Sequence, residues 1–328
     1  MPSRRLRCSN QQDEAMVLLK FTFGRLLQLV PVLLGITLIA FLLLRVLPGD
    51  PATLILGSRG TAEDIARLTT QLGLDRPLWQ QYLEFLGDML RGSFGQSIAY
   101  HTAVGPLILE RLWTTLALVG FSTVLAVVMT IPFALMAALH KGGVVDHAIK
   151  VFFVVMMSMP AFWLGVLLVL LLSIAFPIFP VSGLGEGILG RLHHLFLPSF
   201  IIALGTAALT IRSLRSSLID VLKADYIDTA LAKGLRARRV LFAHVLRNSL
   251  ISTISVLGVH TSWVIGGTVV IEAVFAIPGL GYLLLSSISA RDYPMVQGLT
   301  VTFAVLVVTI NLITDIAYAA ADPRVKLS

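Results

Sequence analysis

The chain has 328 residues, of which 56% are hydrophobic and only 13% are charged, about half the charged share of an ordinary soluble domain. This composition excludes a disordered chain and disfavours a soluble globule, which needs a more strongly charged surface. The single cysteine, Cys8, excludes a disulfide scaffold, an iron–sulfur site and a cysteine-built zinc site. The net charge of +7 does not require nucleic acid as a partner, because Lys and Arg gather in the cytoplasmic loops of membrane proteins.

Six apolar stretches are candidates to cross a bilayer, which takes about 20 residues. They cover residues 27–44, 112–139, 151–176, 196–211, 250–273 and 296–320. The first has a longer apolar core than a signal peptide and no A-x-A pattern after it, so we expect it to be retained. The fourth is the weakest, because it is short and contains Pro198 and Gly205. The sequence therefore predicts an all-α membrane protein with six transmembrane helices.

Basic residues predict the orientation of these helices. The densest group lies between the fourth and fifth stretches and comprises Arg212, Arg215, Lys223, Lys233, Arg236, Arg238, Arg239 and Arg247. The two short loops on the other side keep only Arg191 and Arg291. We therefore expect both termini to be cytoplasmic.

This orientation divides the chain into four parts. We expect a polar tail over residues 1–20, a first transmembrane helix within 21–48, an extracytoplasmic loop over 49–111, and a five-helix core over 112–328 with a cytoplasmic loop at 212–248. In the extracytoplasmic loop, Thr61 and Asp64 have the spacing of a helix start. Residues 78–90 place apolar side chains at helical spacing. These segments predict short amphipathic helices that lie on the outer membrane face or cap the bundle; a helical hairpin without function is the alternative.

The sequence contains none of the common catalytic or metal-binding motifs. It has no G-x-x-x-x-G-K-[ST], no H-E-x-x-H, no G-x-S-x-G and no paired-cysteine pattern. His193 and His194 are adjacent, and neighbouring side chains seldom face one ion. We expect no covalent chemistry and no metal or cofactor bound by this chain.

The basic loop has the most informative pattern. Residues 225–233 are rich in Ala and Leu and favour a short helix, and Gly234 suits its C-terminal cap. A second amphipathic helix is predicted at about 237–247. Such a helix–Gly–helix unit is a compact knob that another protein can grip; a basic loop without a partner is the alternative.

This loop resembles a known element. Asp228-Thr-Ala-x-x-x-Gly234 is similar to the E-A-A-x-x-x-G element of ABC-importer membrane subunits, with Asp228 and Thr229 in place of Glu and Ala. Where the family usually continues with I-x-L-P, this chain has His244-Val-Leu246-Arg247 and shares only the Leu. This variant resembles the sequence that is usual in the dipeptide/oligopeptide permease branch. In that family the element is a coupling helix that sits in a cleft of the ATPase subunit. The resemblance therefore implies a set of ATPase-coupling residues: Asp225, Asp228, Thr229, Ala230, Lys233, Gly234 and Arg238.

Further stretches resemble the same branch, in order, from about residue 21 to residue 325. They include Leu33-Leu-Gly-Ile-Thr37, Leu47-Pro-Gly-Asp-Pro51, Ser158-Met-Pro-Ala-Phe-Trp163, Glu272-Ala-Val-Phe275, Asp292-Tyr-Pro294 and Asp322-Pro-Arg324. The resemblance implies a type I ABC importer permease fold in the bacterial cytoplasmic membrane. It also implies a second, similar permease subunit, two ATPase subunits that bind ATP and Mg, and an extracytoplasmic solute-binding protein. The implied solute is a di- or oligopeptide; nickel complexes and glutathione-like solutes, which close relatives carry, remain alternatives.

Two groups of residues are candidates for the transport pathway and its outer gate. Pro160 should kink the third span, and the carbonyl that it frees either lines a pathway or merely accompanies a packing kink. His260, Thr261 and Ser262, near the middle of the fifth span, either contact a polar solute or bond to other membrane groups and fix helix register. Gly258, Ser262 and Gly266 form a stripe of small residues that suits close helix packing.

The loop Pro278-Gly-Leu-Gly281 interrupts the chain before a short outer helix at about 282–290. We expect a re-entrant outer scoop that faces the pathway, with Glu272, Pro278, Gly279 and Gly281 at the outer gate and a structural role for Glu272. A rigid substitution at Gly279 or Gly281 should slow transport while assembly survives.

Two other classes of protein compete with an importer subunit. An ion-gradient secondary transporter needs a mid-span carboxylate and usually an internal repeat; Asp315 is the one candidate carboxylate, and no repeat is evident. An intramembrane enzyme needs a nucleophile–base pair, and none stands out. The importer subunit is therefore the favoured interpretation.

Overall fold

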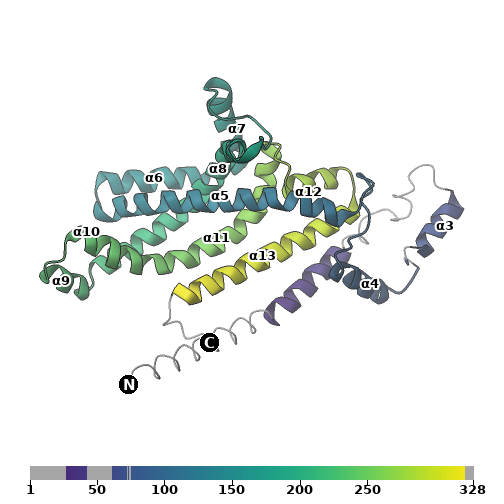
Figure 1. Ribbon diagram of the computed structural model, residues 1–328, viewed down its shortest axis with the longest axis horizontal. Coiled ribbons are helices and arrows are strands. Elements are labelled where there is room, and N and C mark those ends of the chain that lie inside the picture. The colour runs from purple at the N-terminus through teal and green to yellow at the C-terminus, as the bar shows by residue number, and fades with distance from the viewer. Residues whose placement is uncertain (1–26, 43–60, 72, 74, 322–328) are drawn as a thin grey trace, which may run out of the picture.

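The computed structural model describes residues 27–42, 61–71, 73 and 75–321. Nearly all of these residues lie in helices or in the turns between them, and the one strand-like pairing in this part of the chain is an isolated bridge between Gln96 and Ala103. The predicted all-α architecture is confirmed. Figure 1 shows most of the long helices side by side in an elongated bundle.

Four helices are long and apolar enough to cross a membrane. They are α5 (Val104–Leu139), α8 (Gly187–Leu222), α11 (Arg247–Val274) and α13 (Tyr293–Ala321). They correspond to the predicted second, fourth, fifth and sixth spans. The helix Leu27–Leu42, at the predicted first span, is apolar but shorter, and the residues that flank it lie outside the described part of the chain.

The predicted third span is a sharp bend and not a kinked helix. Helix α6 (Val144–Ser158) is followed by α7 (Ala161–Val169) and the π-helical η2 (Leu170–Ala175), and the two arms are bent by 101°. Pro160 causes this break. It disfavours the helical conformation of the preceding residue, and Met159 is accordingly extended, with φ −82° and ψ 134°.

Helix α8 was predicted to be the weakest span, and this prediction is wrong. It has 36 residues, and 61% of its most apolar window is buried, against 28%, 22% and 17% in the other three helices. Pro198 is buried inside the helix and does not end it. The fully buried Ala203 and Ala207 let neighbouring helices approach α8 closely. Its ends are polar, so a hydropathy window finds only the middle of the helix.

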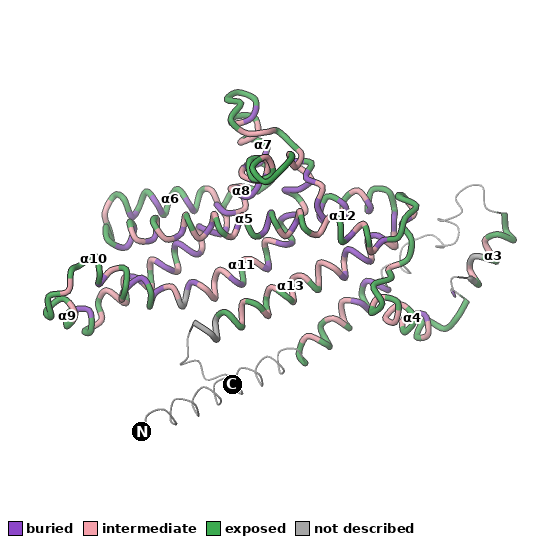
Figure 2. Tube along the Cα trace, in the orientation of Figure 1, coloured by how far each residue is buried: buried purple, intermediate pink, exposed green. Residues whose placement is uncertain are grey.

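Two apolar clusters hold the bundle together. The larger joins α5, α6, α8 and α11, and Figure 2 shows buried positions along α5 and α8. The smaller lies at the other end of α5, where α5 packs against α12 (Leu280–Ser289) and the start of α13; it comprises Val104, Ile108, Leu280, Leu283, Met295 and Leu299. The larger cluster also contains Ile227 of the basic loop, and the smaller one contains Leu280 and Leu283 of the short helix after the PGLG loop.

Two short helices, α3 (Ala62–Gln71) and α4 (Leu78–Leu90), lie where the sequence predicts them. Thr61 caps α3 as expected: the Asp64 amide donates to Thr61 Oγ1 at 3.2 Å, and the Thr61 amide donates back to Asp64 Oδ2 at 3.2 Å. The Thr61 hydroxyl also donates to Asp64 Oδ2, at 2.6 Å. The hydrogen bonds from the Thr61 side chain and backbone lower the pKa of the exposed Asp64 carboxyl. This is the reciprocal pattern of a capping box.

The basic residues gather at one end of the bundle. Figure 1 places α9 (Asp225–Ala232) and α10 (Ala237–Val240) at that end, next to the start of α6, and places α12 towards the opposite end. The end of α5, the start of α6 and the end of α8 meet there, and they carry Lys141, Lys150 and Arg215. The fold therefore separates the basic knob from the PGLG segment by the length of α11, 28 residues or about 42 Å.

Candidate functional site

The basic knob is built as the sequence predicts. Helix α9 begins at Asp225 and ends at Ala232, with Asp225 and Asp228 in its first turn, where the helix dipole favours acidic side chains. Ile227 is its buried residue, at 3% exposure, and holds the helix to the large core cluster. The Asn248 side chain donates to Tyr226 Oη at 3.0 Å and ties α9 to the start of α11.

Gly234 ends this helix in the left-handed conformation, with φ +82°. The Gly234 amide donates to the Leu231 carbonyl at 2.9 Å, and the Leu235 amide donates to the Ala230 carbonyl at 3.3 Å. These two bonds form a Schellman motif, in which Gly is preferred because a side chain disfavours positive φ. The predicted C-cap role of Gly234 is confirmed.

The predicted coupling residues share one exposed surface. Asp225, Asp228, Thr229, Lys233, Gly234 and Arg238 are all exposed, whereas Ala230 is partly buried against the core. Beyond Gly234 the chain continues through α10 and the π-helical η3 (Leu241–Leu246) directly into α11. The exposed Arg236, Arg238, Arg239 and Phe242 line a shallow open hollow beside Gly234. The hollow therefore has a cationic rim with one aromatic side chain, Phe242.

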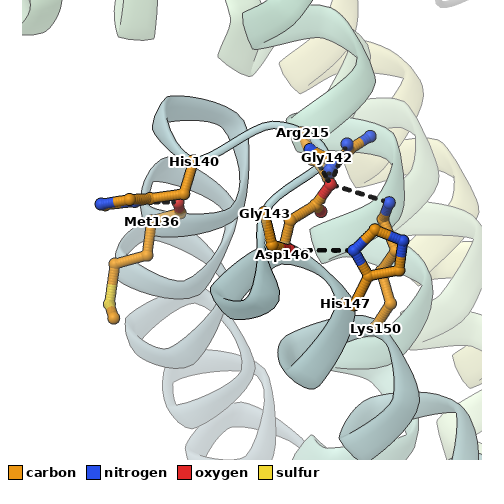
Figure 3. Close-up of polar contacts among 8 residues, drawn as sticks. All are labelled: Met136, His140, Gly142, Gly143, Asp146, His147, Lys150 and Arg215. Carbon is orange, nitrogen blue, oxygen red and sulfur yellow. Dashed lines mark hydrogen bonds and ion pairs between the residues drawn. The ribbon is translucent and has the colours of Figure 1, made fainter.

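A buried carboxylate, Asp146, fixes the helix that leads into the knob (Figure 3). Its side chain is fully buried, and both of its oxygens accept hydrogen bonds from Arg215 of α8: Nε donates to Oδ1 at 2.7 Å and Nη2 donates to Oδ2 at 2.6 Å. Lys150 Nζ lies 2.9 Å from Oδ2, and the Gly142 amide donates to the same oxygen at 2.9 Å. This cluster joins the α5–α6 turn, α6 and the last part of α8, ten residues before α9 begins at Asp225. We call it the Asp146 clamp.

The sequence interpretation did not single out Asp146, although it named Arg215 among the basic residues. A local signal was present, because Asp146 and Lys150 stand four residues apart on one helix face. The pairing with Arg215 has no local signal, because 69 residues separate the two partners.

At the opposite end of the bundle, Glu272 is fully buried and caps α12. Its Oε2 accepts hydrogen bonds from the amides of Gly281 at 2.7 Å and Tyr282 at 3.0 Å. Its Oε1 accepts one from Thr115 Oγ1 at 2.7 Å, and Thr115 in turn accepts one from the Leu280 amide at 2.8 Å. One carboxylate and one hydroxyl thus bind three amides of the first turn of α12, which otherwise lack helical partners. The structural role that the sequence analysis favours for Glu272 agrees with this geometry.

The glycines of the PGLG segment are required by contact with this carboxylate. A side chain at Gly279 would overlap Glu272, and one at Gly281 would overlap the Val269 backbone. These overlaps argue against the expectation that a rigid substitution at either glycine spares assembly, because each position lies against packed atoms. Pro278 is partly buried between the end of α11 and the start of α12.

The turn between α11 and α12 also carries backbone strain. Ala276 has φ +46°, a left-handed conformation that costs a residue with a side chain about 1 kcal/mol. It occupies the position that glycine usually takes in a Schellman motif: the Ala276 amide donates to the Ala273 carbonyl at 3.3 Å, and the Ile277 amide donates to the Glu272 carbonyl at 2.9 Å. The fully buried Ile277 holds this turn in place.

A second buried carboxylate that sequence reasoning missed, Asp292, holds the segment before α5. Asp292 accepts hydrogen bonds from the Ser97 hydroxyl, from the Ala99 amide at 3.2 Å and from the Met295 amide at 3.3 Å. It stands directly before α13, which begins at Tyr293, so its position as an N-cap is readable from the sequence. Its contact with Ser97, 195 residues away, is not.

The predicted pathway residues each make separate contacts. Pro160 lies in the break between α6 and α7, where its carbonyl accepts a hydrogen bond from the Leu164 amide at 3.1 Å. Thr261 donates to the Leu257 carbonyl of its own helix at 2.9 Å, and His260 is partly buried on the same helix. Ser262 donates to Asn311 Oδ1 of α13 at 2.6 Å. The Ser262 contact supports the alternative interpretation, in which polar groups fix the register of α11 against α13.

One part of the small-residue stripe on α11 also packs against α13. A side chain at Gly258 would overlap Thr314 of α13, so this glycine allows the two helices to approach closely. Gly266 has no atom of the described chain within 4 Å of the position that its side chain would take. The stripe therefore packs within the chain over its first half.

Comparisons with known proteins identify the family. Residues 130–327 match the family described as "Binding-protein-dependent transport system inner membrane component", and residues 18–119 match the N-terminal family of the same membrane components. The chain belongs to this family. It is thus a permease subunit, an inner-membrane component of a transport system, and not itself an enzyme.

The relatives agree with this family over nearly the whole chain. The oligopeptide transport system permease protein AppB of Bacillus subtilis is 42% identical over 93% of this chain and 99% of its own length. The dipeptide transport system permease protein DppB of Escherichia coli is 33% identical over 94% of this chain and 99% of its own length.

A solved structure shows the same fold. A chain of the MetNI methionine ABC transporter, in an inward-facing conformation, matches with a TM-score of 0.54 over 66% of this chain and 96% of its own length, at 17% sequence identity. The type I importer permease fold implied by the sequence is therefore supported for this permease.

Proposed function

We propose that this permease forms half of the translocation pathway of an ATP-driven importer for dipeptides or oligopeptides. The observation that carries the proposal is the 42% identity to an oligopeptide permease over 93% of the chain. The second relative described above has a dipeptide permease name. Since the match covers 93% of this chain, and so includes the core helices as well as the knob, it supports a shared solute class in addition to a shared coupling to an ATPase.

We assign ATPase coupling to the knob formed by α9 and Gly234. The knob is exposed, is capped by a Schellman motif and stands at one end of the bundle (Figure 1). The knob connects α8 to α11. The Asp146 clamp holds α8, and α11 continues without interruption to Glu272 at the other end of the bundle. A displacement of the knob is therefore carried along a rigid helix of about 42 Å to the cap of α12. This arrangement supports alternating access in which an ATPase moves the knob and α12 gates the outer side.

The complete transporter contains more than this chain. We propose a second, similar permease subunit, two ATPase subunits that bind ATP and Mg, and an extracytoplasmic solute-binding protein. We also propose six spans with both termini in the cytoplasm. The gathering of basic residues at the knob end supports this orientation, because Lys and Arg favour the cytoplasmic side.

The test is reconstitution with and without partners. The tagged permease, purified from cells that express its whole transport system, should bring down an ATPase subunit. Proteoliposomes that contain the full complex and the solute-binding protein should accumulate a radiolabelled dipeptide or tetrapeptide only when ATP is supplied on the knob side. Uptake by the permease alone, driven by an ion gradient, would contradict the proposal, and so would ATP-driven uptake of nickel without uptake of any peptide.

A further inference from the structure

Helix α4 has three distinct faces. Successive residues of an α-helix are rotated by about 100°, so the side chains of α4 (Leu78–Leu90) sort by direction. One face holds Tyr82 and Phe85, which pack against the helix Leu27–Leu42. A second face is polar and holds Gln80, Glu84 and Asp88. The third face is apolar and holds Trp79, Leu83, Leu86 and Leu90.

The third face is exposed although its side chains are large and apolar. Trp79 is 63% exposed, Leu83 57% and Leu90 84%. Isolated exposed leucines are normal on protein surfaces, but these side chains form one continuous stripe beside a polar face. This is the pattern of a helix that lies at a membrane interface.

The contacts of α4 place it at membrane depth. Tyr82 Oη donates to the Leu34 carbonyl at 3.0 Å and lies 3.0 Å from Thr37 Oγ1. The Phe41 ring lies 5.3 Å from Tyr82 and 6.0 Å from Phe85, measured between ring centroids. Leu34 is about two turns, roughly 12 Å, before Leu42, where this apolar helix ends in the described part of the chain. Helix α4 therefore crosses the last turns of a membrane helix and does not stand above them.

We propose that α4 is an interfacial helix whose Trp79–Leu90 stripe is covered by acyl chains of the outer leaflet. The polar face, with Glu84 and Asp88, then meets the headgroups and water, and Trp79 takes the interfacial position that tryptophan favours. This inference goes beyond peptide transport; it rests on the proposed membrane span at residues 27–42 and on the proposed orientation, and not on the solute. It also revises the extracytoplasmic loop predicted over residues 49–111: within this loop, residues 78–90 lie at the membrane boundary.

Spin labels test the proposal directly. Because Cys8 is the sole cysteine in the chain, a Cys8→Ser background allows one label at a time. Leu83→Cys and Leu90→Cys report on the stripe. Asp88→Cys, which is exposed and on the polar face of the same helix, is the matched control. The complete transporter is reconstituted in liposomes, and collisions of each label with oxygen, which concentrates in acyl chains, are compared with collisions with a water-soluble nickel chelate.

The expected result is an oxygen-to-chelate ratio severalfold higher at positions 83 and 90 than at position 88. A chelate-dominated ratio at positions 83 and 90 would overturn the proposal, because the stripe would then face water. Low accessibility to both reagents there would also overturn it, because another protein subunit would then cover the stripe. Peptide uptake and ATPase co-purification are measured on the same samples, so a failure of the proposed function is seen separately from a failure of this inference.

Discussion

The Asp146 clamp gives the sharpest test of how the knob is held. In the Asp146→Asn variant, Arg215 loses its bidentate carboxylate partner while its side chain stays only 17% exposed. Removing one partner of a buried ion pair costs about 3–5 kcal/mol. Lys150 is 43% exposed, and its pairing adds little because water screens it. We therefore expect a loss of about 3 kcal/mol in the free energy of unfolding.

This loss should lower the apparent melting temperature of the permease in the purified complex by about 4 °C, measured by intrinsic fluorescence. Glu63→Gln is the matched control. It removes a carboxylate that pairs with Arg67 at 2.9 Å, but both side chains are more than two thirds exposed, at 78% and 71%, so the change should be within about 0.5 kcal/mol. Because the clamp holds the end of α8, Asp146→Asn should also lower the peptide uptake per ATP hydrolysed.

A double-mutant cycle separates the pair from its surroundings. Arg215→Gln should destabilise the complex on its own, and the double variant with Asp146→Asn should lose less than the sum of the two single variants. If Asp146→Asn melts at the same temperature as Glu63→Gln, or if the two single effects simply add, the reasoning about a buried clamp is refuted.

Three further predictions concern the glycines and the turn at the ends of α11 and α9. Gly234→Val forces a β-branched residue to φ +82°, at a cost of at least about 1 kcal/mol, and should abolish ATP-coupled uptake while membrane insertion persists; normal uptake in vesicles would count against the knob. Gly279→Ala should reduce the yield of folded complex in detergent because its side chain overlaps Glu272, whereas Gly267→Ala, which meets nothing within 4 Å, should not; equal yields would contradict the packing argument. Ala276→Gly should raise the melting temperature, because it relieves about 1 kcal/mol of left-handed strain; an unchanged or lower value would show that no strain is stored there.

The parts of the structure that the sequence predicted well depend on signals a few residues apart. The Thr61 cap, the bounds of α4 and the left-handed Gly234 each rest on residues within one helix and its cap. The buried contacts that hold the knob end and the PGLG end of the bundle could not be predicted in this way. Asp146 meets Arg215 from 69 residues away, and Glu272 meets Thr115 from 157 residues away. No local pattern marks such pairs, since any carboxylate can accept from any donor that the fold brings near.

The third and fourth spans show why hydropathy alone misjudged two helices. A hydropathy window averages over residues, so it read the segment around Pro160 as one helix, whereas the conformation of Met159 turns the chain by 101°. The same average undervalued α8, because Arg212 and Arg215 dilute the apolar signal at its end. In the structure this helix is the most buried of the four long ones, and Arg215 is neutralised by a partner on another helix.

The sequence by itself determined that this chain lies in a membrane, which end carries the basic knob and which family it resembles. Membrane location follows from the transfer of each segment out of water and from backbone hydrogen bonds made within that segment, so it can be read from each segment alone. The resemblance likewise rests on short motifs. Only the tertiary structure decided which polar groups meet inside the bundle, how sharply the chain turns at Pro160 and which face of α4 stays exposed. Those outcomes depend on contacts between segments that are distant in the sequence. Such a contact contributes free energy only after the helices pack, so neither segment indicates it alone.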